Sequence, residues 1–199
     1  MPRPIIGSQR RTHPLIWCVA IVCTFCTVIV IITGMVVFIG YLAIQPKVPF
    51  VSVTYAHVDK FEYITQSSVL NTEISIVFKA QNDNAKAHVS FSEFVYYLKF
   101  HGLIIAKLQN HAFEVNKNDS VTFNYDVKSY SIPLDLYHSA MVDRSYRENR
   151  ISFDLIGRTR TRWRVGPFKS VKFWLHLNCE LKFQLDGINV DSHCTTKSK

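Results

Sequence analysis

The order of hydrophobic and polar positions divides the chain into two parts. From Leu15 to Ile44, thirty consecutive residues include no Asp, Glu, Lys, Arg or His, and also no Ser, Asn or Gln. A helix of this length is about 45 Å long, whereas the hydrocarbon core of a bilayer is about 30 Å thick. A helix in a soluble core carries a polar stripe, which this segment lacks. The pattern predicts a transmembrane helix over residues 15–44, preceded by a short tail over residues 1–14.

The charges on either side of this segment predict its orientation. Arg3, Arg10 and Arg11 precede it, whereas Lys47 is the only formal charge between it and Asp59. The positive-inside rule therefore places the tail in the cytoplasm and residues 45–199 outside the cell or in a lumen. A cleavable signal peptide has an apolar region about half as long and small residues before the cut. We expect an uncleaved signal anchor in a single-pass membrane protein.

Beyond Pro49 the pattern alternates between apolar and polar positions, as is typical of half-buried strands. Turn residues separate the alternating segments, with Asn82-Asp83-Asn84, His101-Gly102 and Gly166-Pro167 among them. Helical spacing occurs once, where Pro133 fits the first position of a helix that ends near Tyr146. The segments predicted as strands cover 51–55, 70–78, 89–100, 103–108, 121–127, 151–155, 158–165 and 171–177.

These segments predict a mainly β fold for residues 45–199. Short strands with turns between them and one helix are typical of an antiparallel, fibronectin- or immunoglobulin-like β-sandwich. The side chains expected on the buried face of this helix are Leu134, Tyr137, Ala140 and Met141. We expect one sandwich domain after the transmembrane helix.

The most distinctive polar pattern is the segment Arg158-Thr159-Arg160-Thr161-Arg162-Trp163-Arg164. On a strand, its four arginines lie on one face, while the two threonines and the tryptophan lie on the other. The arginines form either an anion-binding ridge or a solvated face that discourages edge-to-edge aggregation. Because like charges along one strand repel, we expect acidic or aromatic groups beside them. The candidate anion-binding residues are Arg158, Arg160, Arg162 and Arg164.

The formal charge of +8 includes only three arginines from the tail, so the outer domain is also basic. Its partners could be anionic headgroups, acidic polymers or acidic proteins. Nucleic acid is disfavoured on that side of a membrane. The chain contains no G-x-S-x-G, H-E-x-x-H or phosphate-binding glycine motif, and the histidines after the helix never occur at i, i+2 or i, i+4 spacing. We expect no enzyme, no cofactor and no metal site.

The cysteines fall into two groups. Three of them lie inside the predicted helix, where we interpret them as small apolar residues. Cys179 and Cys194 lie in a compartment where disulfides persist, so they form either a bond or two buried thiols. Asn118-Asp119-Ser120 is the only glycosylation sequon, which makes Asn118 a candidate site.

Several of these motifs together resemble a known family. The segment Gly157–Ser170 resembles the late signature of plant group 2 late-embryogenesis-abundant domains. More narrowly, the chain resembles their membrane-anchored branch, which is named for non-race-specific disease resistance and harpin-induced proteins. Asn82-Asp83-Asn84 lies where that branch has Asn-Pro-Asn, with Asp83 replacing the proline. Phe100-His101-Gly102 resembles its Tyr-x-Gly turn, and Asn178-Cys179 with Cys194 resembles its closing cysteine pair, although the tail after Cys194 is short.

This resemblance implies a fibronectin-like sandwich and a link to pathogen defence or abiotic stress. It implies the plasma membrane, with the endoplasmic reticulum or plasmodesmata as alternatives, and no known catalytic activity. Our leading hypothesis is a non-enzymatic interaction protein that presents the sandwich to cell-wall or membrane partners. The alternatives are a lipid-binding module with an apolar cleft between the sheets and a stress-protective domain without a specific ligand.

Overall fold

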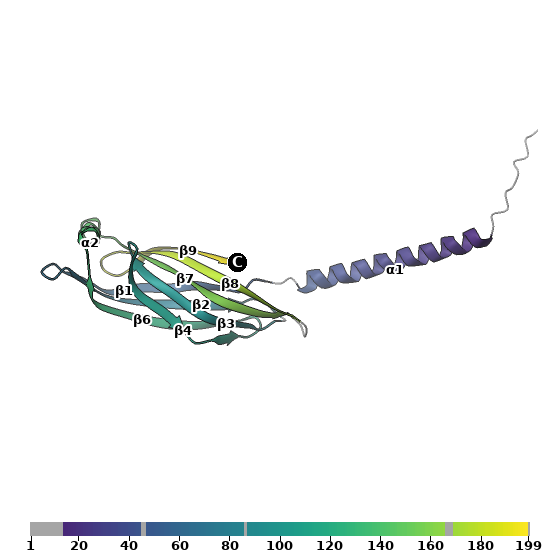
Figure 1. Ribbon diagram of the computed structural model, residues 1–199, viewed down its shortest axis with the longest axis horizontal. Helices are drawn as coiled ribbons and strands as arrows, with labels where there is room; N and C mark the ends of the chain where they lie inside the picture. Colours follow the sequence, from purple (N-terminus) through teal and green to yellow (C-terminus); the bar gives the residue numbers. More distant parts are fainter. Residues whose placement is uncertain (1–13, 45–46, 86, 166–168, 199) are drawn as a thin grey trace, which may run out of the picture. The chain divides into compact units, whose positions relative to one another are not determined.

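The computed structural model describes residues 14–44, 47–85, 87–165 and 169–198 (Figure 1). The chain forms two compact units, one up to residue 45 and the other from residue 46 onwards. Arg3, Arg10 and Arg11 lie outside the described residues, so the predicted orientation stays a prediction. The predicted Gly166-Pro167 turn also lies outside them.

The first unit contains helix α1, Pro14–Ile44, which begins one residue before the predicted segment. Its residues Pro14–Gly40 form a helix long and apolar enough to cross a membrane. The hydroxyl groups of Thr24 and Thr33 each donate a hydrogen bond of 2.7 Å to the carbonyl four residues earlier. Such internal bonds leave these hydroxyls satisfied without water, which suits a helix in lipid.

The second unit is an antiparallel β-sandwich, as predicted. One sheet has the strand order β1-β2-β6, and the other has the order β4-β3-β7-β8-β9, with the short β5 paired to β3. One helix, α2 (Leu136–Glu148), follows β6. The strands are β1 (Phe50–Ile64), β2 (Val69–Asn82), β3 (Val89–Phe100), β4 (Leu103–Asn110), β5 (Phe113–Val115), β6 (Asp119–Pro133), β7 (Ile151–Val165), β8 (Lys169–Phe183) and β9 (Asn189–Ser198).

Aromatic side chains fill the space between the two sheets. Alternate residues of β2 point inward as predicted, and so do alternate residues of β3 on each side of an irregularity at Glu93. The Phe78 ring of one sheet packs against Phe94 and Tyr96 of the other, with centroids 5.4 and 5.3 Å apart. Ring pairs at these distances stabilise a core beyond the area that they bury. The burial of Tyr96 raises the pKa of its phenol.

Two buried asparagines join three segments at one end of the sandwich. The Asn82 side-chain amide donates hydrogen bonds of 2.8 Å to the Ala87 carbonyl and 2.9 Å to the Asn116 carbonyl. Its oxygen accepts from the Asn84 side chain at 2.9 Å, and Asn84 in turn accepts from the Lys47 backbone at 2.9 Å. The predicted turn at residues 82–84 therefore fixes the start of the domain.

The prediction that Pro133 occupies the first helical position was wrong. Pro133 is the last residue of β6 and lies opposite Val69. Helix α2 begins at Leu136 because the Asp135 side chain caps it, accepting a 2.8 Å hydrogen bond from the His138 backbone. Hydrogen bonds from the backbone and the ring of His138 hold the pKa of the Asp135 carboxyl group below its ordinary value.

The predicted buried face of this helix was also partly wrong. Tyr137 and Ala140 are exposed, and the buried positions are Val142 and Ser145, while Met141 packs partly against the core. Val142 and Ser145 are three residues apart and lie on one face of α2, whereas Tyr137 and Ala140 point elsewhere because successive residues differ in direction by about 100°.

The predicted break at Gly157 was wrong as well, because β7 runs without interruption from Ile151 to Val165. Gly157 is instead a packing requirement. A Cβ atom at this position would lie 2.3 Å from the Val95 carbonyl oxygen and 2.4 Å from the Tyr96 ring. The glycine therefore allows β3 and β7 to pair closely around the buried Tyr96.

We expect Gly157→Ala to lower the free energy of unfolding by about 2 kcal/mol, because the added methyl group forces β3 and β7 apart. Denaturant unfolding of the detergent-solubilised chain, followed by tryptophan fluorescence, measures the effect. Ser170→Ala, an exposed change on the adjacent strand, is the control and should stay within about 0.5 kcal/mol. An equal stability of both variants would contradict the packing argument.

Candidate anion-binding face

The four arginines lie on the outer face of the six-stranded sheet, as the alternation predicts. Thr159 and Thr161 are fully buried, whereas the arginines between and beside them are exposed. Trp163 also points inward, but it is only partly buried, since it lies near the end of β7. We call Arg158, Arg160, Arg162 and Arg164 the arginine row.

The expected acidic and aromatic neighbours are present at one half of the row. Arg160 forms an ion pair of 3.0 Å with Glu93. The guanidinium carbons of Arg158 and Arg160 lie 4.7 and 5.8 Å from the centroid of the Trp174 ring. Cation–π contacts at these distances are favourable even at exposed sites. Glu93 and Trp174 thus offset part of the repulsion within the row.

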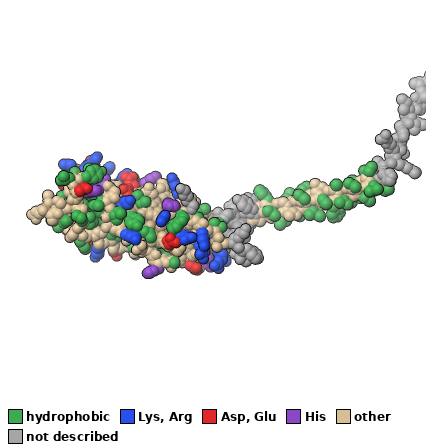
Figure 2. Space-filling model, in the orientation of Figure 1, with side chains coloured by type: hydrophobic (Ala, Val, Ile, Leu, Met, Phe, Trp, Pro, Cys, Tyr) green, Lys and Arg blue, Asp and Glu red, His purple; other side chains and the backbone are tan. Residues whose placement is uncertain are grey.

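The other half of the row is less well compensated, since its nearby acidic residue, Glu114, borders a groove with Arg162 and Arg164 without forming an ion pair. Within the described part of the chain, Arg162 and Arg164 have no ion pair. The strand register places Lys172 of β8 directly opposite Arg162. Like charges directly opposite each other destabilise a sheet. Figure 2 shows a group of Lys and Arg side chains at one end of the β domain, with others scattered over its visible face and at α2.

An open groove of about 350 Å³ lies between these charges, and its polar lining consists of Ser90, Ser92, Glu93, Arg160, Arg162 and Lys172. The Glu93 carboxylate in this lining is already paired with Arg160. Guanidinium, ammonium and hydroxyl groups all donate hydrogen bonds, so this lining suits carboxylate, sulfate or phosphate oxygens.

A second open groove of about 480 Å³ lies beside Trp174 and is lined also by Tyr97, Lys107, Arg158 and His176. It adds aromatic surface to the same basic face. Among the described residues, no group of three or more His, Cys, Asp or Glu side chains could hold a metal ion. The face therefore carries mainly cationic and hydrogen-bond-donating side chains.

Sequence reasoning missed Glu93, Trp174 and Lys172 as neighbours of the row. Their positions depend on the pairing of β7 with β3 and β8, which the sequence pattern does not reveal. Glu93 reaches Arg160 at an irregularity in the β3–β7 register between Ser92 and Val95, where its φ is +52°. No local signal predicts such a bulge.

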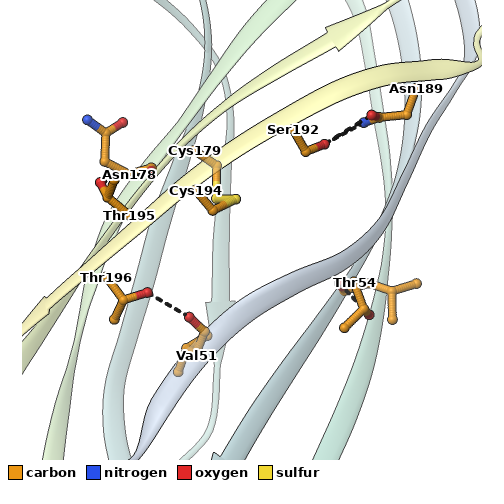
Figure 3. The surroundings of a disulfide bond; sticks show 10 residues. Val51, Thr54, Asn178, Cys179, Asn189, Ser192, Cys194, Thr195 and Thr196 are labelled. Atoms are coloured by element: carbon orange, nitrogen blue, oxygen red, sulfur yellow. Dashed lines mark hydrogen bonds between the residues drawn. A yellow bond between two sulfur atoms is a disulfide. The ribbon is translucent and has the colours of Figure 1, made fainter.

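The predicted disulfide between Cys179 and Cys194 is confirmed. The two residues lie opposite each other on β8 and β9, so the bond joins neighbouring strands of one sheet (Figure 3). Cys179 is fully buried. The remaining cysteines among the described residues, Cys18, Cys23 and Cys26, are free and lie on α1.

The candidate glycosylation residue Asn118 lies in the turn before β6, with an exposed side chain and a φ of +51°. Its backbone N–H donates a 3.1 Å hydrogen bond to the Asn84 carbonyl. A glycan on Asn118 stays a prediction.

No protein-family model matches the chain, and no curated protein matches it. Among solved structures, the chain is similar to a protein from Archaeoglobus fulgidus known from its crystal structure. The two are 14% identical, with a TM-score of 0.31, over 67% of this chain and 97% of that chain. A likeness at this level carries no argument about function.

We expect Cys179→Ser with Cys194→Ser to lower the free energy of unfolding by about 3 kcal/mol, because the bond closes a short loop with a sequence separation of 15. Denaturant unfolding of the full chain in detergent measures the loss. Adding reductant to the unsubstituted protein should reproduce it, and reductant should leave the double variant unchanged. Identical stability with and without reductant would contradict a structural role for the bond.

Proposed function

We propose that this chain is a single-pass, membrane-anchored interaction protein without catalytic activity. Its β-sandwich lies outside the cytoplasm and binds an acidic partner through the arginine row. The arginines, Lys172 and the two grooves supply positive charge and hydrogen-bond donors on one face, and α1 supplies the anchor. The partner is an acidic polymer or an acidic surface on a membrane or cell-wall protein.

The observation that carries this proposal is the unpaired half of the row. Arg162 and Arg164 point outward and form no ion pair among the described residues, although Glu114 borders a groove with them. Lys172 lies opposite Arg162. On a purely solvated face, repulsion among these three cations opposes folding. An anion that bridges them removes this repulsion.

The proposed compartment draws support from two features. The disulfide between Cys179 and Cys194 is of a kind that persists in oxidising compartments, outside the cytoplasm. The arginines of the tail agree with the same topology. From the family resemblance, we further propose the plasma membrane as the location and defence or stress signalling as the process.

The packing of the domain favours the interaction protein over the lipid-binding alternative. An acyl chain between the sheets would need an apolar cavity there, and aromatic side chains such as Phe78, Phe94 and Tyr96 occupy the centre of that space. By contrast, apolar side chains are exposed on α2, where Leu136 is 93% accessible. Such residues suit contacts with a protein partner.

We expect Arg162→Gln with Arg164→Gln to weaken binding to polygalacturonate at low salt. The loss should shrink as salt rises, because exposed charges are screened over about 8 Å at physiological ionic strength. Binding of a labelled polymer to the full chain in neutral nanodiscs measures the affinity. The free energy of unfolding should change by no more than about 0.5 kcal/mol.

The matched control is Arg147→Gln with Arg150→Gln, which removes the same charge from α2 and the residue that follows it, away from the row. This control should bind as well as the unsubstituted chain. Equal binding at low salt by the unsubstituted chain, the row variant and the control variant would contradict the proposal. The row would then be a solvated sheet face without a binding role.

We expect the second unit to lie on the side of the membrane opposite to the tail, because of the arginines before α1. Protease treatment of sealed microsomes should spare a tag at the C-terminus and remove a tag at the N-terminus. Detergent should then expose the C-terminal tag to the protease. Digestion of the C-terminal tag in sealed microsomes would reverse the proposed topology.

A further inference from the structure

Strands β1 and β9 form the edges of the two sheets on the same side of the sandwich. In the part of the chain that the structure describes, β1 pairs only with β2, and β9 pairs only with β8. Two hydrogen bonds connect β1 to the segment that contains β9. The Thr196 hydroxyl donates a 3.0 Å bond to the Val51 carbonyl (Figure 3), and the Val58 backbone N–H donates a 3.1 Å bond to the Gly187 carbonyl.

An open cavity of about 530 Å³ lies between these two bridges. Its lining includes five consecutive residues of β1, from Val53 to His57, together with Ile188, Asn189 and Ser192. Successive side chains of a strand point to opposite faces. Five consecutive residues therefore border the cavity with the main-chain edge of the strand, not with one of its faces.

This main-chain edge is unpaired in the region of the cavity. Among the described residues, the backbone of β1 between Ser52 and His57 has main-chain hydrogen-bond partners only on β2. At the two ends of the cavity, the edge of β1 that faces away from β2 is already bonded. The Val51 carbonyl accepts a hydrogen bond there, and the Val58 N–H donates one. The edge thus offers free donors and acceptors between two points where other segments already dock.

We propose that this edge of β1 is a binding site for an extended peptide, which adds as a strand between β1 and β9. A polypeptide main chain presents N–H and C=O groups in series, as β1 does on each side of the irregularity between Val53 and Tyr55, so it can satisfy them. An acyl chain would leave these groups without partners, at a cost in free energy. The site contains none of the four arginines, so it is independent of the proposed anion-binding function.

The dimensions and rim of the site define its ligand more closely. The seven steps from Val51 to Val58 correspond to about 23 Å of extended chain, which holds a segment of roughly five or six residues between the bridges. Tyr55 and Ile188 beside the cavity are 54% and 56% exposed. These side chains favour a segment with apolar, β-forming residues at alternate positions.

Gly187 fixes one end of the site. Its φ is +85°, and a Cβ atom there would lie 2.0 Å from the Val58 carbonyl oxygen. Only glycine allows the loop before β9 to approach β1 closely enough for the bond between Val58 and Gly187. This close approach separates the site from the rest of the β1 edge.

The probe that tests the site is the peptide Ser-Ile-Val-Phe-Lys with acetyl and amide ends. It copies residues 75–79 of β2, which pair with β1 residues between Ser52 and His57 on the other edge. Hydrogen exchange of the full chain in neutral nanodiscs, analysed by mass spectrometry, measures protection with the probe at millimolar concentration. We expect slower exchange in fragments covering residues 51–58 and 188–192, and unchanged exchange in fragments covering 158–164.

Two comparisons show whether the main chain of the probe carries the binding. A probe with two alternate amides N-methylated should bind at least about tenfold more weakly, since it loses donors and gains bulk at the paired edge. Ser192→Trp, which fills the cavity, should weaken binding by a similar factor. Thr195→Trp, an exposed position of β9 outside the lining, should leave it unchanged. Unchanged exchange at residues 51–58 in the presence of the probe, or equal binding of the N-methylated probe, would overturn the proposal.

Discussion

The alternation of side chains along β7 governs both the interior and the charged surface of the sandwich. In the second half of β7, successive side chains point to opposite faces of the sheet. Because Thr159 and Thr161 are buried, the arginines beside them are exposed to solvent. A shift of one residue would bury guanidinium groups and expose the apolar face, which makes the register strongly determined. Gly157 maintains this register across the whole strand, because it lets β7 pass the Tyr96 ring without interruption.

Residues with a strong local pattern were predictable from the sequence. The buried face of β3 from Phe94 to Phe100 and the outward direction of the arginine row follow from a two-residue period, and the structure confirms them. The start of α2 and the continuity of β7 were not predictable from that period. Pro133 fits a helix start as well as a strand end, and the Asp135 cap decides between them. Gly157 is a common turn residue, and only its contact with β3 explains its place inside a strand.

The candidate site shows the same limit. The sequence indicates four arginines, but their environment depends on which strands lie beside β7. Register brings Trp174 and Lys172 next to the row from β8, and a bulge in β3 turns Glu93 toward Arg160. The two halves of the row therefore differ because of the strands that lie beside them in the sheet. Their four arginines occupy equivalent, alternating positions in the sequence.

The central claim is that the arginine row contacts an acidic partner on the intact cell. A photo-crosslinking amino acid at position 172, beside Arg162, tests it most directly, with the same residue at position 147 of α2 as reference. The account predicts crosslinked adducts from position 172 that carry acidic polymers or proteins and disappear when salt is raised before irradiation. Adducts from position 147 alone would contradict the claim. It would also be contradicted if adducts from position 172 persisted at high salt and in the Arg162→Gln, Arg164→Gln variant.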